Sequence, residues 1–325
     1  MPDLFNIMFN VIAPIFIVLG ITFFIGKRFN PDPRSLSPFL IYLFGPALVF
    51  KGIYQTELSG GELGRIGIMV LGVSLAMMVI AALTARLLNF KQRAASSLTL
   101  AVILMNAGNY GIPLNTFAFG EDGGNVAIVY YVATAMMGNI LGVYFASRGT
   151  FKVKDSLLNV LKVPIAYAAG LGLLFNIYNI ELPLIIQRSV IDIASGASIP
   201  LMLALLGLHL SRVSFKQIKQ HKKAKNDTHE ESLASDIRAI TVGVGLKLLI
   251  APLVAVGFAI VLGLRGTVLS VAIVQSSMPT AVFATALATE FGSDAPYVTA
   301  VTIVSTLLSI ITLTVLLFIL GGVAI

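Results

Sequence analysis

The stretch Met105-Asn106-Ala107-Gly108-Asn109-Tyr110-Gly111-Ile112-Pro113 interrupts a long apolar segment of the chain. Proline removes a backbone donor and clashes with the preceding helical turn, and the glycines lower the cost of unwinding. The helix expected over residues 95–119 is therefore predicted to be discontinuous near its middle. A single proline kink held by interhelical asparagine bonds is the alternative interpretation.

The composition around this stretch indicates that lipid is the main solvent of the protein. Of the 325 residues, 57% are hydrophobic and 11% are charged, and the mean hydropathy is +0.93. The chain is predicted to be an all-α integral membrane protein with ten transmembrane helices. Windows long enough to cross a bilayer cover residues 4–25, 37–56, 64–88, 95–119, 124–147, 160–178, 184–210, 239–262, 267–289 and 296–320.

The distribution of basic residues predicts the orientation of these helices. If the N-terminus lies outside, the cytoplasmic connections carry 17 of the 22 Lys and Arg residues, and the outside segments carry four. This bias places both termini outside the cytoplasmic membrane and residues 211–238 in the cytoplasm as a linker. The same bias accounts for the net charge of +7, so we expect no nucleic-acid partner. Binding of anionic lipid or a regulator to the basic linker is a second possibility.

The two halves of the chain resemble each other in the order of their motifs. Gly45-Pro46 in the second window corresponds to Ile199-Pro200 in the seventh, and the break at 106–113 corresponds to Gln275-Ser276-Ser277-Met278-Pro279-Thr280 in the ninth. An odd number of helices per half makes the second copy enter the membrane from the opposite side, which predicts two inverted five-helix repeats with discontinuous helices 4 and 9. The predicted boundaries are 1–150 for the first repeat, 151–210 for helices 6 and 7, 211–238 for the linker and 239–325 for helices 8–10.

The two breaks are the predicted substrate site. Freed amides and carbonyls in a membrane must face protein or a water-filled cavity, and half-helix N-termini favour an anionic group such as a carboxylate. Hydroxyls that bond back to their own helix are the competing explanation for the serines and threonine. The candidate substrate-binding residues are Asn106, Gly108, Asn109, Tyr110, Pro113, Asn139, Gln275, Ser276, Ser277, Pro279 and Thr280.

Three charged residues within the apolar windows are candidates for a coupling or charge role. Lys247 lies deep in the eighth window, where it could contact substrate or a proton, snorkel to the cytoplasmic interface, or pair with a carbonyl end in the protein interior. Asp192 and Glu290 lie nearer to the ends of their windows, and an interfacial position is the favoured interpretation for both.

The sequence lacks the residues of several other function classes. It contains no cysteine, and its three histidines do not form a ligand pattern, so we expect no metal and no cofactor. It contains no phosphate-binding GxxxxGK[ST] loop. Intramembrane acids are sparse, and the chain is not predicted to be an enzyme.

Four stretches resemble the auxin efflux carrier family, which includes plant PIN-type exporters and bacterial malate or malonate carriers. They are Asn106–Leu114, Ile199–Gly207, Leu246–Leu253 and Ser276–Asp294. The plant proteins' long cytoplasmic loop is missing, so the resemblance is to the short prokaryotic branch. The family has the architecture of bile-acid sodium symporters, whose sodium-ligand pattern is not intact here.

The resemblance implies a scaffold of helices 1, 2, 6 and 7 that commonly forms a homodimer, and a transport domain of helices 3–5 and 8–10. It assigns substrate binding to Asn106, the crossing prolines to Pro113 and Pro279, and a polar lining residue to Asn139. The predicted function is secondary transport of a small organic anion, a mono- or dicarboxylate, by alternating access. A channel or a transporter-like sensor for a small organic solute is the alternative.

Overall fold

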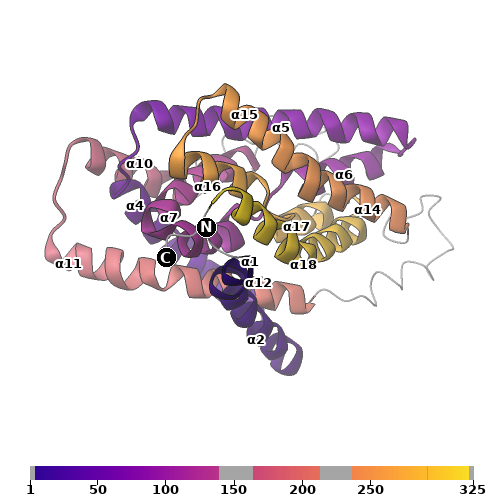
Figure 1. Cartoon of the computed structure of the whole chain (residues 1–325). Coiled ribbons are helices and arrows are strands. Elements are labelled where there is room, and N and C mark those ends of the chain that lie inside the picture. The colour runs from indigo at the N-terminus through magenta and orange to yellow at the C-terminus, as the bar shows by residue number, and fades with distance from the viewer. Residues whose placement is uncertain (1–3, 139–163, 213–235, 291, 322–325) are drawn as a thin grey trace.

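The computed structural model describes residues 4–138, 164–212, 236–290 and 292–321 (Figure 1). These residues are helical throughout their ordered elements, and extended pairing among them is confined to one isolated bridge. The all-helical class predicted from composition is therefore confirmed.

Within the described residues, six helical runs are long and apolar enough to cross a membrane, and they match six of the ten expected windows. They are Leu4–Phe29, Pro33–Tyr54, Gly60–Leu87, Leu184–Arg212, Ile237–Val261 and Ala295–Ile319. Their α-helices are α1 (Leu4–Ile7), α2 (Ala13–Phe29), α3 (Pro33–Phe39), α4 (Gly45–Tyr54), α5 (Gly60–Leu87), α11 (Leu184–Ile186), α12 (Ser198–Arg212), α14 (Ile237–Gly245), α15 (Ala251–Val261) and α18 (Ala295–Ile319).

The other four windows are represented by shorter or interrupted helices. The fourth and ninth are divided at their breaks, and the fifth and sixth run into residues 139–163, which lie outside the described part. The corresponding helices are α6 (Gln92–Ile103), α7 (Ile112–Met137), α10 (Pro164–Ile177), α16 (Gly266–Ser276) and α17 (Val282–Glu290). Helix α7 is interrupted by a kink at Gly120, whose φ of 72° is left-handed, so it consists of residues 112–119 and 121–137.

Prolines shape the local geometry of the long helices. Four π-helical segments each end two residues before a proline: Met8–Ile12, Leu40–Phe44, Ala107–Gly111 and Leu246–Ile250 precede Pro14, Pro46, Pro113 and Pro252. Proline cannot donate to the carbonyl four residues earlier and its ring collides with that carbonyl. A widened turn moves the carbonyl aside and lets the helix continue.

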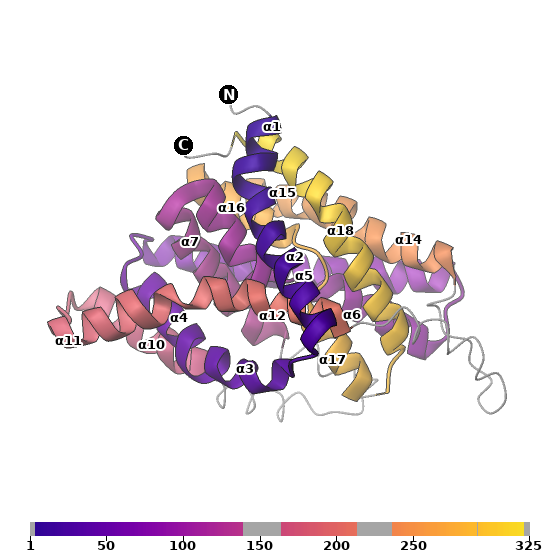
Figure 2. The ribbon, with the colours of Figure 1, turned by 90° about the horizontal axis from the view of Figure 1, so that it is seen from below.

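The described helices pack against one another in several extensive pairs. Helix α2 crosses α12 and α4 packs along α10 (Figures 1 and 2), while α5 packs against α6 and α15, α16 against α7, and α18 against α14 and α17. A Cβ at Gly207 of α12 would lie 2.5 Å from the Leu19 carbonyl oxygen of α2, and one at Gly172 of α10 would lie 2.9 Å from the Phe50 carbonyl oxygen of α4. Both pairs, α2 with α12 and α4 with α10, therefore depend on close backbone approach, as small residues permit in membranes.

Apolar side chains cover much of the outer surface. Only 28–50% of the most apolar window of each long helix is buried inside the molecule. Phe24, Leu87, Ile185 and Val261 are each more than 70% exposed. Such a surface requires an apolar solvent, so the protein is a multi-pass membrane protein.

Candidate functional site

The two predicted breaks cross each other and pair through their backbones. Met105 and Thr280 form an antiparallel bridge. The Asn106 amide donates to the Pro279 carbonyl at 2.9 Å, and the Ala281 amide donates to the Leu104 carbonyl at 2.9 Å. The crossing brings together the C-terminal ends of α6 and α16 and the N-terminal ends of α7 and α17.

The carbonyl end of α6 is capped by groups from other helices. The Thr280 hydroxyl donates to the Ala101 carbonyl at 2.6 Å, and the Lys247 ammonium donates to the Val102 carbonyl at 3.1 Å. Carbonyls in the last turn of a helix lack intrahelical partners, so these contacts satisfy acceptors that lipid could not. The capping also ties the helical run Ile237–Val261 and the segment between α16 and α17 to α6.

The amide end that leads into α7 is arranged differently. The Gly111 amide donates to the Asn106 carbonyl at 3.0 Å, which closes the π-helical turn, and the Asn106 side chain makes no capping bond. The first amides of a helix have no intrahelical acceptor, and Pro113 has no amide hydrogen. This end therefore offers donors and a positive dipole end toward the crossing.

Within the described part of the chain, three buried polar atoms near the crossing have no hydrogen-bond partner. They are Asn106 Nδ2, Gln275 Oε1 and Asn115 Oδ1. Their residues are 6%, 0% and 0% exposed. Buried polar atoms in folded proteins are nearly always paired, and each exception requires an explanation such as a functional role. The structure thus places both an unused donor and unused acceptors at the break.

Gln275 holds the two broken helices together. Its Nε2 donates to the Ala107 carbonyl at 3.3 Å and to the Ala127 carbonyl at 3.0 Å. A Cβ on Gly111 would lie 2.1 Å from Gln275 Oε1. Only glycine at position 111 leaves room for this side chain.

The predicted hydroxyl ligands are occupied within the protein. Ser277 Oγ donates to the Ile273 carbonyl at 2.7 Å, and Ser276 Oγ donates to the Ala272 carbonyl at 2.8 Å and lies 2.7 Å from the Tyr130 hydroxyl. The interpretation in which serines bond back to their own helix therefore describes this conformation. Gln275 and Ser276 also lie in the last turn of α16, so the unwound part is shorter than the sequence indicated.

The side chains that follow Asn106 point into different surroundings. Asn109 is half-buried, and Gly108 packs against Tyr131, whose ring would lie 2.7 Å from a Cβ there. Tyr110 is fully buried, accepts a hydrogen bond from Ser309 Oγ at 3.4 Å and packs edge-on against Phe16 of α2. Tyr110 is thus a contact between the break and the first helix.

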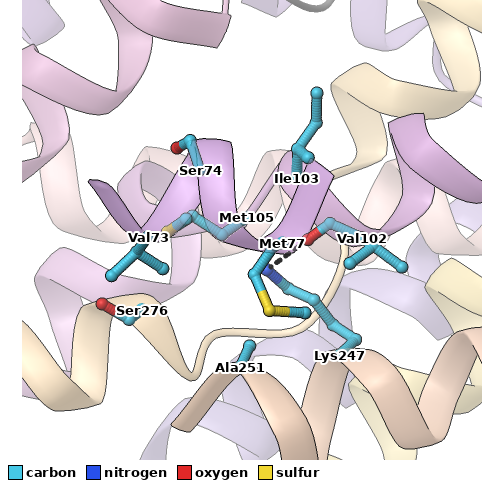
Figure 3. A pocket seen from close by; sticks show the side chains of 9 residues that line it. All are labelled: Val73, Ser74, Met77, Val102, Ile103, Met105, Lys247, Ala251 and Ser276. Atoms are coloured by element: carbon cyan, nitrogen blue, oxygen red, sulfur yellow. Dashed lines mark hydrogen bonds between the residues drawn. The ribbon is translucent and has the colours of Figure 1, made fainter. Parts of the chain in front are cut away.

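A small cavity lies beside the crossing, and Lys247 reaches across it (Figure 3). It is too narrow to hold a water molecule. Its lining comes from Val73, Ser74, Met77, Val102, Ile103, Met105, Lys247, Ala251 and Ser276. Lys247 is 0% exposed, so it does not snorkel; it pairs with a carbonyl end, one of the alternatives left open by the sequence.

The remaining predicted residues lie away from the crossing or outside the described part. Asp192 and Glu290 are exposed, and Asn139 lies outside the described residues. Sequence reasoning did not single out Tyr130, Tyr131 or Asn115, all close to the crossing. The adjacent tyrosines in the apolar fifth window were the available signal. Among the described residues, no group of three His, Asp or Glu side chains could hold a metal ion.

Comparisons with known proteins relate the chain to membrane transporters. A family model described as membrane transport protein matches residues 150–317. The chain is 30% identical over 290 residues to an uncharacterized transporter of Methanothermobacter thermautotrophicus, covering 89% of each protein. It is 24% identical over 285 residues to an uncharacterized transporter of Methanocaldococcus jannaschii, covering 86% of each.

Proposed function

The chain belongs to the membrane transport protein family, the auxin efflux carrier-like family that its motifs resemble, and on this premise we propose that it carries a small organic anion across the cytoplasmic membrane by alternating access. The substrate class is a mono- or dicarboxylate related to malate, malonate or auxin. The observation that carries the proposal is the crossing of two broken helices with an unpartnered amide, Asn106 Nδ2, buried beside it.

An inverted repeat of ten helices would explain why two broken helices from different halves of the chain cross each other. Left-handed residues recur at the ends of equivalent helices: Asn30 and Asn179 follow helices 1 and 6, Asn89 and Gly263 follow helices 3 and 8, and Gly120 and Gly292 follow the second halves of helices 4 and 9. Packing recurs as well. The pairing of α2 with α12 has its equivalent in α10 with α4, and that of α5 with α6 has its equivalent in α15 with α16. These correspondences support a five-helix offset between the halves.

The same packing supports a division of the protein into two units with different roles in transport. Helices 1, 2, 6 and 7 would form a scaffold unit that dimerises, and helices 3–5 and 8–10 would form a transport unit that contains both broken helices. The cavity beside the crossing has no room for a water molecule. Binding and release therefore require a rearrangement, which we assign to movement of the transport unit against the scaffold unit.

The carboxylate would bind between the amide ends of α7 and α17. Charge-assisted hydrogen bonds from Asn106 Nδ2 and from free backbone amides would hold its oxygens, and the positive helix ends would favour its charge. Asn109 and Asn139 are the further side chains that we assign to the substrate. In the orientation that we propose, both termini lie outside and residues 211–238 lie in the cytoplasm.

Two other functions remain distinguishable by experiment. A channel would conduct without saturation or exchange, and a sensor would bind a carboxylate without moving it. The family relationship favours transport over both. Catalysis has no support from the described residues, whose acids lie mainly at helix ends.

Flux in proteoliposomes tests the proposal. We expect saturable uptake of at least one of malate, malonate and indole-3-acetate, each radiolabelled, and faster uptake when the vesicles are loaded with the same unlabelled compound. A proton gradient, a membrane potential and a sodium gradient are imposed separately to identify the driving force. Folded protein that binds a carboxylate without flux would identify a sensor, and non-saturable flux would identify a channel.

A further inference from the structure

Lys247 places an amino group in the middle of a membrane-spanning helix. It lies in the π-helical segment Leu246–Ile250 near the centre of Ile237–Val261, and its side chain is 0% exposed. Figure 3 shows its amino group directed at the Val102 carbonyl, to which it donates at 3.1 Å. Lysine is rare at such depth because the cost of removing its charge from water is high, and its presence indicates a function.

Carboxylates do not balance this charge in the described part of the chain. The ion pairs found there join Lys51 with Glu121 and Arg212 with Asp32. The partner of Lys247 is instead a carbonyl in the last turn of α6, at the negative end of that helix dipole. Broken helices in secondary transporters use such C-terminal ends to hold coupling cations. An ammonium tethered to the chain occupies the equivalent position here.

Lys247 lies in the unit that we propose moves together with the substrate. Every element that lines its cavity belongs to the proposed transport unit: α5, α6 and the segment that follows it, the eighth helix, and α16. Val102 lies four residues before Asn106, so the amino group of Lys247 contacts the same broken helix within a few residues of the proposed carboxylate site. Other charged residues of the described transport helices lie within about two turns of a helix end.

We propose that Lys247 is a built-in counter-charge that moves with the carboxylate and cancels one negative charge of the loaded transport unit. With a monocarboxylate the loaded unit crosses the membrane without net charge, and the empty unit crosses with one positive charge. The membrane potential then acts on the return of the empty unit instead of on the loaded step. This inference rests on the proposed function and adds the charge carried in each step.

Voltage dependence of exchange tests the counter-charge. Wild type and Lys247→Met are reconstituted with labelled substrate on one side and the same unlabelled substrate at saturating concentration on both sides, so that the empty unit is not visited. The probe is indole-3-acetate, or malonate if wild type carries only dicarboxylates. One charge moved through the full field changes the equilibrium of a two-state step by about 50-fold per 100 mV.

We expect indole-3-acetate exchange to change by less than about 1.5-fold per 100 mV in wild type and by about threefold or more in Lys247→Met, since only part of the charge effect appears in the rate. With malonate, the variant is expected to show the steeper dependence of the two. Lys247→Arg keeps the charge and is expected to behave as wild type. Equal voltage dependence in wild type and Lys247→Met would overturn the proposal.

Charge movement without substrate gives a second readout that does not need the carboxylate. Voltage steps applied to wild type are expected to displace charge as the empty unit moves, and Lys247→Met is expected to lose that signal. Lys27→Met, which removes an exposed lysine at the end of α2, is the matched control and should retain it. If no carboxylate is carried, the proposed function fails, and an absent charge movement in folded wild type would then overturn the counter-charge as well.

Discussion

Replacing Asn106 by alanine is expected to weaken carboxylate binding by about 10- to 100-fold and to leave the melting temperature unchanged or raised. The affinity loss follows from the removal of a hydrogen bond to a charged group, worth about 1.5–3 kcal/mol. The stability follows from the unpartnered state of Asn106 Nδ2, because a buried donor without an acceptor costs free energy that alanine removes. A polar group that destabilises the fold is expected at a binding site.

Calorimetric titration of purified protein with the transported carboxylate measures the first effect, and temperature-dependent size-exclusion chromatography measures the second. Asn176→Ala is the matched control, since Asn176 Nδ2 donates to the Tyr54 carbonyl at 2.8 Å and to the Thr56 carbonyl at 2.9 Å. We expect that variant to melt at a lower temperature and to bind with unchanged affinity. Wild-type affinity in Asn106→Ala would remove Asn106 from the site.

A methyl group at position 111 is expected to destabilise the protein and to stop transport. The Cβ of Gly111→Ala would lie 2.1 Å from Gln275 Oε1, and Gln275 is fully buried. Its side chain can move only by releasing the Ala107 and Ala127 carbonyls. Gln275 Nε2 would then be a buried donor without an acceptor, which costs about 1–3 kcal/mol, so we expect a loss of roughly 1–3 kcal/mol.

Gly257→Ala is the control for this second prediction. Gly257 also lies within a helix, but a Cβ there meets no atom within 4 Å. Alanine has the higher helix propensity, so this variant should melt at or above the wild-type temperature. The double variant Gly111→Ala with Gln275→Ala should recover part of the loss, because the two residues are in contact. A wild-type melting temperature for Gly111→Ala alone would contradict the packing at the crossing.

The sequence predicted the helices better than it predicted their contacts. Long apolar windows identified six spanning helices, and the prolines and glycines within the windows identified the two breaks. Both signals are local, because hydropathy and a missing backbone donor act on the segment that contains them. The bridge between Met105 and Thr280 joins residues 175 positions apart, and no local pattern predicts which residues of two broken helices will pair.

Side-chain roles at the crossing depended on the same long-range geometry. Ser277 and Thr280 look alike in the sequence, yet one hydroxyl donates to its own helix and the other caps the Ala101 carbonyl of α6. Lys247 had three interpretations, and only the position of the Val102 carbonyl distinguished the interior pair from snorkelling. Burial depends on which helix is the neighbour, and that information is spread over the whole chain.

Substrate protection of a single cysteine tests most directly whether the carboxylate binds at the crossing. The chain contains no cysteine, so Ala281→Cys places one thiol at a partly buried position whose backbone pairs with Leu104. Gly20→Cys, in α2 with open space around it, is the control. In transport-competent protein, we predict that saturating carboxylate slows modification of residue 281 by a thiol reagent severalfold and leaves residue 20 unaffected. Equal modification rates at residue 281 with and without a carboxylate that the same protein transports would contradict binding at the crossing.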